Sequence, residues 1–161
     1  MMQIEISLAG QLLRLLDKNG QELRRYCIST GAKGAGEVRG SYRTPRGRHV
    51  VRARIGAGLP LNTVFVARRP NGEIYGPALE SERPGRDWIL TRILWLSGCE
   101  PGFNRLGDVD TMRRYIYIHG CPDSAPMGIP ASHGCVRMRN ADIVELFDLI
   151  PVGTPVEIRE D

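Results

Sequence analysis

The chemistry and much of the fold are decided by residues 117–138, which read Tyr-Ile-His-Gly-Cys-Pro-Asp-Ser-Ala-Pro-Met-Gly-Ile-Pro-Ala-Ser-His-Gly-Cys-Val-Arg-Met. This stretch holds two of the three histidines and two of the four cysteines of the chain. Alternation predicts a strand at its start, with Tyr115, Tyr117 and His119 on one face. Three prolines and a Ser-His-Gly-Cys turn follow, so we expect Cys135 on stiff backbone. A thiol with histidines nearby is typical of a cysteine nucleophile.

The same residues indicate which histidine serves the thiol. An imidazole activates a thiol by accepting its proton and pairing with the anion that forms. His133 is only two residues from Cys135 and is poorly placed to face the sulfur, whereas His119 arrives from a separate element. We therefore predict Cys135 as the nucleophile and His119 as the general base. The glycines beside the cysteine let backbone N–H groups face a developing oxyanion.

A zinc site is the competing interpretation. His119 with Cys121, and His133 with Cys135, supply two nitrogen and two sulfur ligands, a set that zinc accepts. Common structural zinc sites separate paired ligands by two to four residues, whereas one residue separates the members of each pair here. Spacing alone therefore makes zinc the weaker interpretation.

The remaining cysteines and the third histidine are predicted to be structural. Cys27 lies in a strand pattern and is expected to pack against its neighbours. Cys99 is expected to be a small buried hydrophobe. Cys121 is undecided. His49 falls on the apolar face of an arginine-rich strand, where a core or cleft-edge histidine is expected rather than a metal ligand.

Outward from this stretch, the pattern predicts a mainly β domain. The pair Asn19-Gly20 tolerates the positive φ angles of a tight hairpin. Residues 31–47 hold five glycines and are predicted to form a long loop. Strands are predicted at residues 3–8, 11–16, 21–29, 48–55, 62–67, 88–97 and 114–119, with a last strand at 154–158.

One helix is predicted near the C-terminus, over residues 141–150. Ile143, Phe147 and Ile150 recur at helical spacing and form its apolar face. Asn140 is expected to cap the helix, and Pro151 to end it.

Length and composition favour one soluble domain spanning residues 1–161. At 17.9 kDa, with 42% hydrophobic and 25% charged residues, the chain can bury a substantial core. No apolar span of 18 residues occurs, so no membrane insertion is expected. The first residues alternate polar and apolar without the features of a secretory leader. The sequence as given therefore predicts a cytoplasmic protein with reduced cysteines.

Positive charge is concentrated in residues 24–69. Ten Arg and one Lys face a single acid there, Glu37, so this stretch carries +10 although the whole chain carries only +4. Between residues 46 and 54 the arginines share one parity. Two interpretations stay open, a solvated sheet surface and a groove for an acidic substrate. Nucleic acid is disfavoured as a partner because few aromatic residues lie among the basic ones.

The chain resembles the L,D-transpeptidase catalytic domain family, of the YkuD type. The resemblance rests on His119-Gly120 sixteen residues before Cys135, and on the run Ser132-His133-Gly134-Cys135-Val136-Arg137-Met138. It extends through the C-terminal helix to Gly153-Thr154-Pro155-Val156. Upstream, Ser29-Thr30-Gly31 and Thr44-Pro45-x-Gly47 also fit, so nearly the whole chain is covered. This resemblance displaces the zinc interpretation and implies neither a metal nor another cofactor.

The resemblance implies a β-sandwich of mixed sheets, with the C-terminal helix packed on it and the cysteine in a cleft. It implies acyl transfer on peptidoglycan stem peptides, in which Cys135 attacks the third, L-centred residue and expels the terminal D-Ala as a thioester forms. His119 would be the base, oriented by a backbone carbonyl such as that of Gly120. The other site residues would be His133, Gly134 and Ser132 around the oxyanion, with N–H donors from Gly134 and Cys135, and Tyr117 and Arg137 toward the substrate.

Two alternatives remain for Arg137, which either holds a substrate carboxylate or braces the cleft. The family commonly has a small hydroxyl residue at the position of Cys121, so this second thiol is expected to raise the chance of oxidative pairing with Cys135.

Because a leaderless enzyme would meet soluble muropeptides, the sequence favours an L,D-carboxypeptidase that trims them in the cytosol. The alternatives are an L,D-transpeptidase that forms cross-links or exchanges D-amino acids, and a non-catalytic module that binds cell-wall peptides or zinc. The sequence leaves open diaminopimelate or lysine at the third position, a lid role for residues 31–47, and the oligomeric state.

Overall fold

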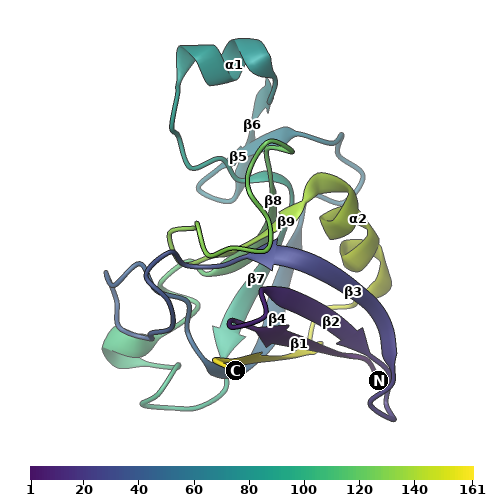
Figure 1. The fold of residues 1–161 in the computed structure, drawn as a ribbon, viewed down its shortest axis with the longest axis vertical. Helices are drawn as coiled ribbons and strands as arrows, with labels where there is room; N and C mark the ends of the chain where they lie inside the picture. Colours follow the sequence, from purple (N-terminus) through teal and green to yellow (C-terminus); the bar gives the residue numbers. More distant parts are fainter.

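Alternating burial along the strands gives this chain an apolar face for its core. The computed structural model describes residues 1–161, and Figure 1 shows their arrangement. Two helices and a 3-10 turn accompany the strands: α1 (Pro77–Glu82), α2 (Asn140–Leu149) and Gly107–Val109. The strands are β1 (Gln3–Ser7), β2 (Leu12–Leu16), β3 (Glu22–Ser29), β4 (Gly47–Ile55), β5 (Thr63–Val66), β6 (Arg69–Ile74), β7 (Leu90–Gly98), β8 (Tyr117–Cys121), β9 (Val136–Arg139) and β10 (Pro155–Arg159).

The ten strands form one mixed sheet in the order β4-β10-β1-β2-β3-β9-β8-β7-β5-β6. Strand β4 also pairs with β7, so the sheet turns back on itself and encloses the core. The pairs β1–β10 and β8–β9 are parallel, and the other pairs are antiparallel. The predicted mainly β fold, with mixed pairing and a C-terminal helix packed on the sheet, is confirmed.

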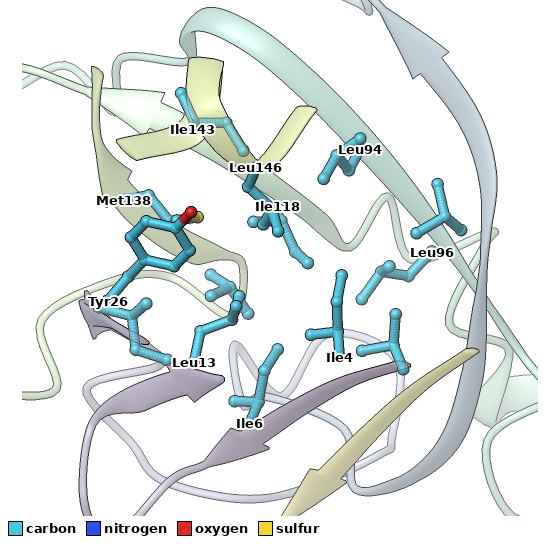
Figure 2. Close-up of a cluster of buried hydrophobic side chains, with 14 of the residues drawn as sticks. Ile4, Ile6, Leu13, Tyr26, Leu94, Leu96, Ile118, Met138, Ile143 and Leu146 are labelled. Atoms are coloured by element: carbon cyan, nitrogen blue, oxygen red, sulfur yellow. The ribbon is translucent and has the colours of Figure 1, made fainter. Parts of the chain in front are cut away.

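The main core lies between the facing parts of the sheet and α2. Figure 2 shows Ile4, Ile6 and Leu13 facing Ile118 and Leu146 across this core. Helix α2 contributes its predicted apolar face, and its buried apolar residues are Ile143, Leu146 and Phe147. Neither helix of the structure has the length and apolar composition needed to cross a membrane.

Strands β5 and β6 and helix α1 project from one end of the molecule, at the top of Figure 1. They have a small core of their own, in which Val64, Trp88 and Leu90 pack with Tyr75 and Leu79. The sequence pattern predicted no strand or helix between residues 68 and 87 and so missed both β6 and α1. This projecting unit borders the site described below.

Two local predictions need correction. Asn140 does not cap α2, because it is the first helical residue and its buried side chain bonds to Thr91, Asn62 and Asp123 instead. Strand β8 begins at Tyr117 rather than at residue 114, because residues 111–115 form turns.

The non-catalytic cysteines differ from expectation, whereas the buried histidine agrees with it. Cys27 is exposed, since alternation places Tyr26 and Ile28 inside and turns Cys27 outward. Cys99 is only partly buried. His49 is buried between Gly47 O and Thr111 Oγ1, each 3.0 Å from a ring nitrogen, and burial lowers its pKa to about 4. His49 is therefore a core residue, as predicted.

The arginine-rich strand β4 forms a solvated surface. Arg48, Arg52 and Arg54 are exposed, while His49 and Val51 face the core. The Arg54 guanidinium lies 4.1 Å from the centre of the Phe147 ring and donates to the Phe147 carbonyl at the end of α2. The first of the two interpretations of the basic face therefore holds for this strand.

Replacing Leu146 tests the packing of α2 on the sheet. Leu146 is fully buried, so Leu146→Ala is expected to cost about 2–5 kcal/mol of unfolding free energy in urea denaturation. The control is Val152→Ala, whose parent side chain is 57% exposed and which should stay within about 0.5 kcal/mol of the unchanged protein. Equal effects of the two substitutions would contradict the proposed core.

Candidate active site

The parallel pairing of β8 with β9 brings together residues distant in sequence. Ile118 is in register with Val136 and His119 with Arg137. Residues in register on parallel strands point to the same face, so His119, Tyr117 and Cys135 lie on one side of the sheet. Cys135 packs against the cluster that contains Tyr117. His119 and Cys135 are therefore diagonal neighbours on adjacent strands, as the predicted pair of base and nucleophile requires.

The turn that carries Cys135 is fixed by three hydrogen bonds. Ser132 Oγ accepts from Gly134 N–H at 3.2 Å and donates to Cys135 O at 2.6 Å. Thr44 Oγ1 donates to Gly134 O at 2.9 Å, which ties the base of the 31–47 loop to this turn. Gly134 has φ +123°, which L side chains rarely adopt. Ser132 is thus a residue that positions the turn rather than one that faces a substrate.

The Cys135 sulfur sits between two backbone groups. Sγ lies 3.3 Å from Tyr115 O, to which the thiol donates, and accepts from Tyr117 N–H at 3.3 Å. Burial raises the pKa of the Cys135 thiol to about 12, against a smaller opposing effect of the Tyr117 N–H. The nucleophile therefore rests as a neutral thiol.

His119 is buried and held in one tautomer. Its Nδ1 is 2.6 Å from Gly120 O, as the family resemblance implied. Because a carbonyl can only accept, Nδ1 carries the proton and Nε2 carries the lone pair. Nε2 is buried and has no hydrogen-bond partner. Burial also lowers the pKa of His119, so the imidazole is neutral and Nε2 is free to accept a proton.

Gly120 is required by the close packing behind His119. A Cβ at this position would lie 2.5 Å from Asn140 Oδ1 and 2.6 Å from Leu90 O. Gly120 therefore has two roles. Its carbonyl orients the imidazole, and the absence of a side chain lets the strand pack closely against Leu90 and Asn140.

One of the two predicted oxyanion donors is free. The Cys135 N–H donates to no backbone or side-chain acceptor, whereas the Gly134 N–H is already bonded to Ser132 Oγ. An oxyanion formed beside the sulfur would therefore meet the Cys135 N–H first.

Arg137 and His133 are linked by an acidic residue that sequence analysis missed. Asp87 Oδ1 accepts from Arg137 Nη2 at 2.8 Å, and Asp87 Oδ2 lies 3.4 Å from His133 Nδ1. Arg137 also donates to Ala131 O at 3.3 Å. The guanidinium is thus braced and charge-compensated, which favours the bracing role left open for it.

Tyr117 does not present its side chain to the cleft as predicted. The ring is buried, and its hydroxyl accepts a hydrogen bond from Arg68 at 2.9 Å. The contribution of Tyr117 to the site is its backbone N–H, which contacts the Cys135 sulfur.

The register rules out the predicted pairing of Cys121 with Cys135. Cys121 is opposite Arg139, four residues beyond Cys135, which separates the two Cα atoms by at least about 13 Å along the strands. A disulfide needs Cα atoms within about 7 Å. Cys121 is buried and its thiol donates to Met138 O. The four proposed zinc ligands likewise do not converge, and no three His, Cys, Asp or Glu side chains do.

Three cavities meet at His133, and two of them border the residues described above. One has a volume of about 380 Å³ and is lined by Arg137, Asp87 and the projecting unit. The other, of about 250 Å³, lies beside the sulfur-contacting residue Tyr115 and is lined by Arg39, Arg113, Arg114 and Tyr42. Of these residues only Tyr42 and Arg39 lie in the 31–47 loop. These residues are brought together by tertiary contacts, so no local sequence motif predicts the cavity.

The resting thiol can be tested by alkylation. Because only a thiolate reacts and burial raises the pKa of Cys135 to about 12, its alkylation by iodoacetamide should quicken about tenfold per pH unit from pH 7 to 9. Peptide mass spectrometry follows this reaction, and exposed Cys27 provides an internal reference in the same sample. A rate for Cys135 that levels off below pH 8 would show a resting thiolate and contradict the neutral pair.

Comparison with known proteins agrees with this geometry. Residues 2–158 match the family model described as the L,D-transpeptidase catalytic domain. A putative L,D-transpeptidase, YkuD of Bacillus licheniformis, is 27% identical over 156 residues, which cover 97% of this chain and 64% of that protein. The probable L,D-transpeptidase YbiS of Escherichia coli is 46% identical over 48 residues, 30% of this chain and 16% of that protein.

Solved structures share the fold. An L,D-transpeptidase from Xylanimonas cellulosilytica aligns with a TM-score of 0.55 at 24% identity, over 98% of this chain and 60% of that one. L,D-transpeptidase 3 from Mycobacterium tuberculosis, in complex with a faropenem-derived adduct, aligns with a TM-score of 0.59 at 16% identity, over 99% and 60%. The chain spans less than two thirds of each of these relatives. With a family match over residues 2–158, the chain belongs to the L,D-transpeptidase catalytic domain family.

Proposed function

We propose that this protein catalyses cysteine-dependent acyl transfer on peptidoglycan stem peptides. The bond cleaved joins the L-centre of the third residue, diaminopimelate or lysine, to the terminal D-Ala. The observation that carries the proposal is the neutral pair of Cys135 and His119, in which Gly120 O holds Nδ1–H and leaves Nε2 as a base. Family membership supports the substrate class.

Acylation follows from this arrangement. His119 Nε2 takes the thiol proton as Cys135 Sγ attacks the carbonyl carbon of the third residue. The Cys135 N–H donates to the oxyanion that develops. The imidazolium, stabilised by the Nδ1–H bond to Gly120 O, then gives its proton to the nitrogen of D-Ala. The C–N bond breaks, D-Ala leaves as an amine, and the peptide remains as a thioester on Cys135.

Deacylation decides between a hydrolase and a transferase, and we propose water as the acceptor. His119 Nε2 takes a proton from a water molecule while the oxygen of that water attacks the thioester carbonyl. The tetrahedral intermediate collapses, Cys135 recovers its proton from His119, and a tripeptide carboxylic acid is released. The product would be a muropeptide shortened by one D-Ala, and the protein would be an L,D-carboxypeptidase of the cytosol.

The distribution of charge supports water over an amine acceptor. The cavity beside Tyr115 is lined by three arginines and no carboxylate. A third cavity, between Lys33 and His133, also has no acidic residue. The ammonium group of an acceptor would therefore be disfavoured beside these basic residues, whereas the carboxylates of a stem peptide would be attracted to them.

Release of D-Ala from a tetrapeptide muropeptide tests the chemistry. Mass spectrometry should detect tripeptide and free D-Ala with the unchanged protein. Cys135→Ala should abolish release because no thioester can form, and His119→Gln should reduce the rate by about 10²- to 10⁴-fold because the general base is lost. Cys27→Ala is the matched control and should keep full activity, since Cys27 is exposed on β3. Unaltered turnover by Cys135→Ala would disprove the proposal.

Competition between acceptors tests the hydrolytic outcome. With a millimolar D-amino acid or a second tetrapeptide present, tripeptide should remain the main product, because the arginines beside Tyr115 disfavour placing the ammonium group of either acceptor next to the thioester. Chromatography with mass spectrometry separates tripeptide, exchanged tetrapeptide and dimer. A majority of exchanged or dimeric product would assign the protein to transpeptidation instead.

A further inference from the structure

The cavity of about 380 Å³ beside His133 and Arg137 has a wall that no sequence motif predicted. That wall is the connection from α1 to β7, which contributes Gly85, Arg86, Asp87 and Trp88. The small core around Trp88 anchors it, because Trp88 is buried with Val64 and Leu90. The connection is therefore fixed at Trp88, and Arg86 and Asp87 precede this anchor along one side of the site.

The positive charge of Arg137 is already compensated in this cavity. Asp87 Oδ1 forms an ion pair with Arg137 Nη2 at 2.8 Å, and Asp87 Oδ2 lies 3.4 Å from His133 Nδ1. The Arg137 side chain is only 13% exposed. To bind a substrate carboxylate, Arg137 would have to share its guanidinium with Asp87, and the two negative groups would repel one another.

Arg86 lines the same cavity and has no such partner. It takes part in neither of these two contacts of Asp87, and its Nη1 is buried without a hydrogen-bond partner. Its guanidinium lies 4.7 Å from the centre of the Trp88 ring, which holds the flat group by a cation–π contact. A buried donor without an acceptor is costly, and a carboxylate is the group whose two oxygens match a guanidinium.

The other acid at the cavity is engaged elsewhere. Glu80 Oε2 accepts from Trp88 Nε1 at 2.8 Å and from the Tyr75 hydroxyl at 3.2 Å. No ion pair joins Glu80 to Arg86. The Trp88 ring thus contacts both residues. Its edge is hydrogen-bonded to Glu80, and its face is covered by the Arg86 guanidinium.

We propose that Arg86 is the substrate-binding residue that pairs with a carboxylate of the stem peptide, in place of Arg137. The proposal rests on the function proposed above and names the charge recognition of that same site. Two carboxylates of a tetrapeptide could occupy the position, that of the terminal D-Ala and that on the side chain of diaminopimelate. Either one would make Arg86 a specificity residue for the reaction.

Binding to the Cys135→Ala protein tests the proposal without requiring turnover. Calorimetric titration compares three ligands: the tetrapeptide, its terminal D-Ala carboxamide, and its diaminopimelate side-chain carboxamide. One carboxamide should bind about 10- to 100-fold more weakly than the acid, the range for a hydrogen-bonded charged pair. Adding Arg86→Gln should weaken the binding of the unmodified tetrapeptide by the same factor and leave the binding of that carboxamide unchanged. The difference in affinity between the two ligands should then disappear. The carboxamide affected identifies which carboxylate is bound.

Two further variants separate recognition from folding. Arg83→Gln removes an exposed guanidinium three residues away and should bind all three ligands as the parent does. Arg86→Lys keeps the charge without the fork and should retain part of the discrimination. Undiminished discrimination in Arg86→Gln, or no binding of the tetrapeptide by the folded parent, would overturn the proposal. Absence of D-Ala release by the unchanged protein, with discrimination intact, would instead refute the proposed reaction.

Discussion

The short parallel pairing of β8 with β9 is the constraint on which the site depends. It sets His119 opposite Arg137, so Cys135 arrives beside Tyr117 on the same face. A slip of one residue would turn His119 to the other face of the sheet. Gly120 helps to fix the position of β8, because a residue with a side chain at this point would collide with Leu90 O and Asn140 Oδ1. The core under α2 and the site above it are therefore held by the same two strands.

Burial of the pair has an effect that the residue types alone do not indicate. It raises the pKa of Cys135 and lowers the pKa of His119, so both changes favour the uncharged forms. A resting thiolate with an imidazolium would place two charges in a poorly solvated site, at a desolvation cost that rises with burial. Proton transfer then accompanies attack on the substrate. The hydrogen bond from Nδ1 to Gly120 O matters for this reason, since it prepares Nε2 in the only state that can accept the proton.

Sequence reasoning worked where local chemistry decides the structure and failed where distant contacts do. Period-two alternation and Asn19-Gly20 predicted β1 to β3, and the apolar stripe predicted α2, because neighbours in sequence determine each. Cys135 and His119 carry a specific motif. Asp87 carries none, and it reaches Arg137 only through the tertiary placement of the α1–β7 connection. Asn140 suits a cap by its type, yet tertiary partners bury it against Thr91. Cys121 is close to Cys135 in sequence, but the strand register keeps them apart.

The positions of the many arginines also have two origins, the local strand pattern for some and tertiary contacts for others. Along β4 the arginines follow the strand period and face solvent, so their charge is a property of a surface. Arg39 comes from one segment and the consecutive Arg113 and Arg114 from another, and the three meet beside Tyr115. Arg114 donates to Gly36 O and Arg43 O, so neutral carbonyls rather than a carboxylate hold it. Asp87 offsets the charge of Arg137. Arginines thus line the cavity beside Tyr115 without a carboxylate, whereas Arg86 and Arg137 share the other cavity with Asp87 and Glu80. This difference gives an acidic peptide a direction of entry as well as an attraction.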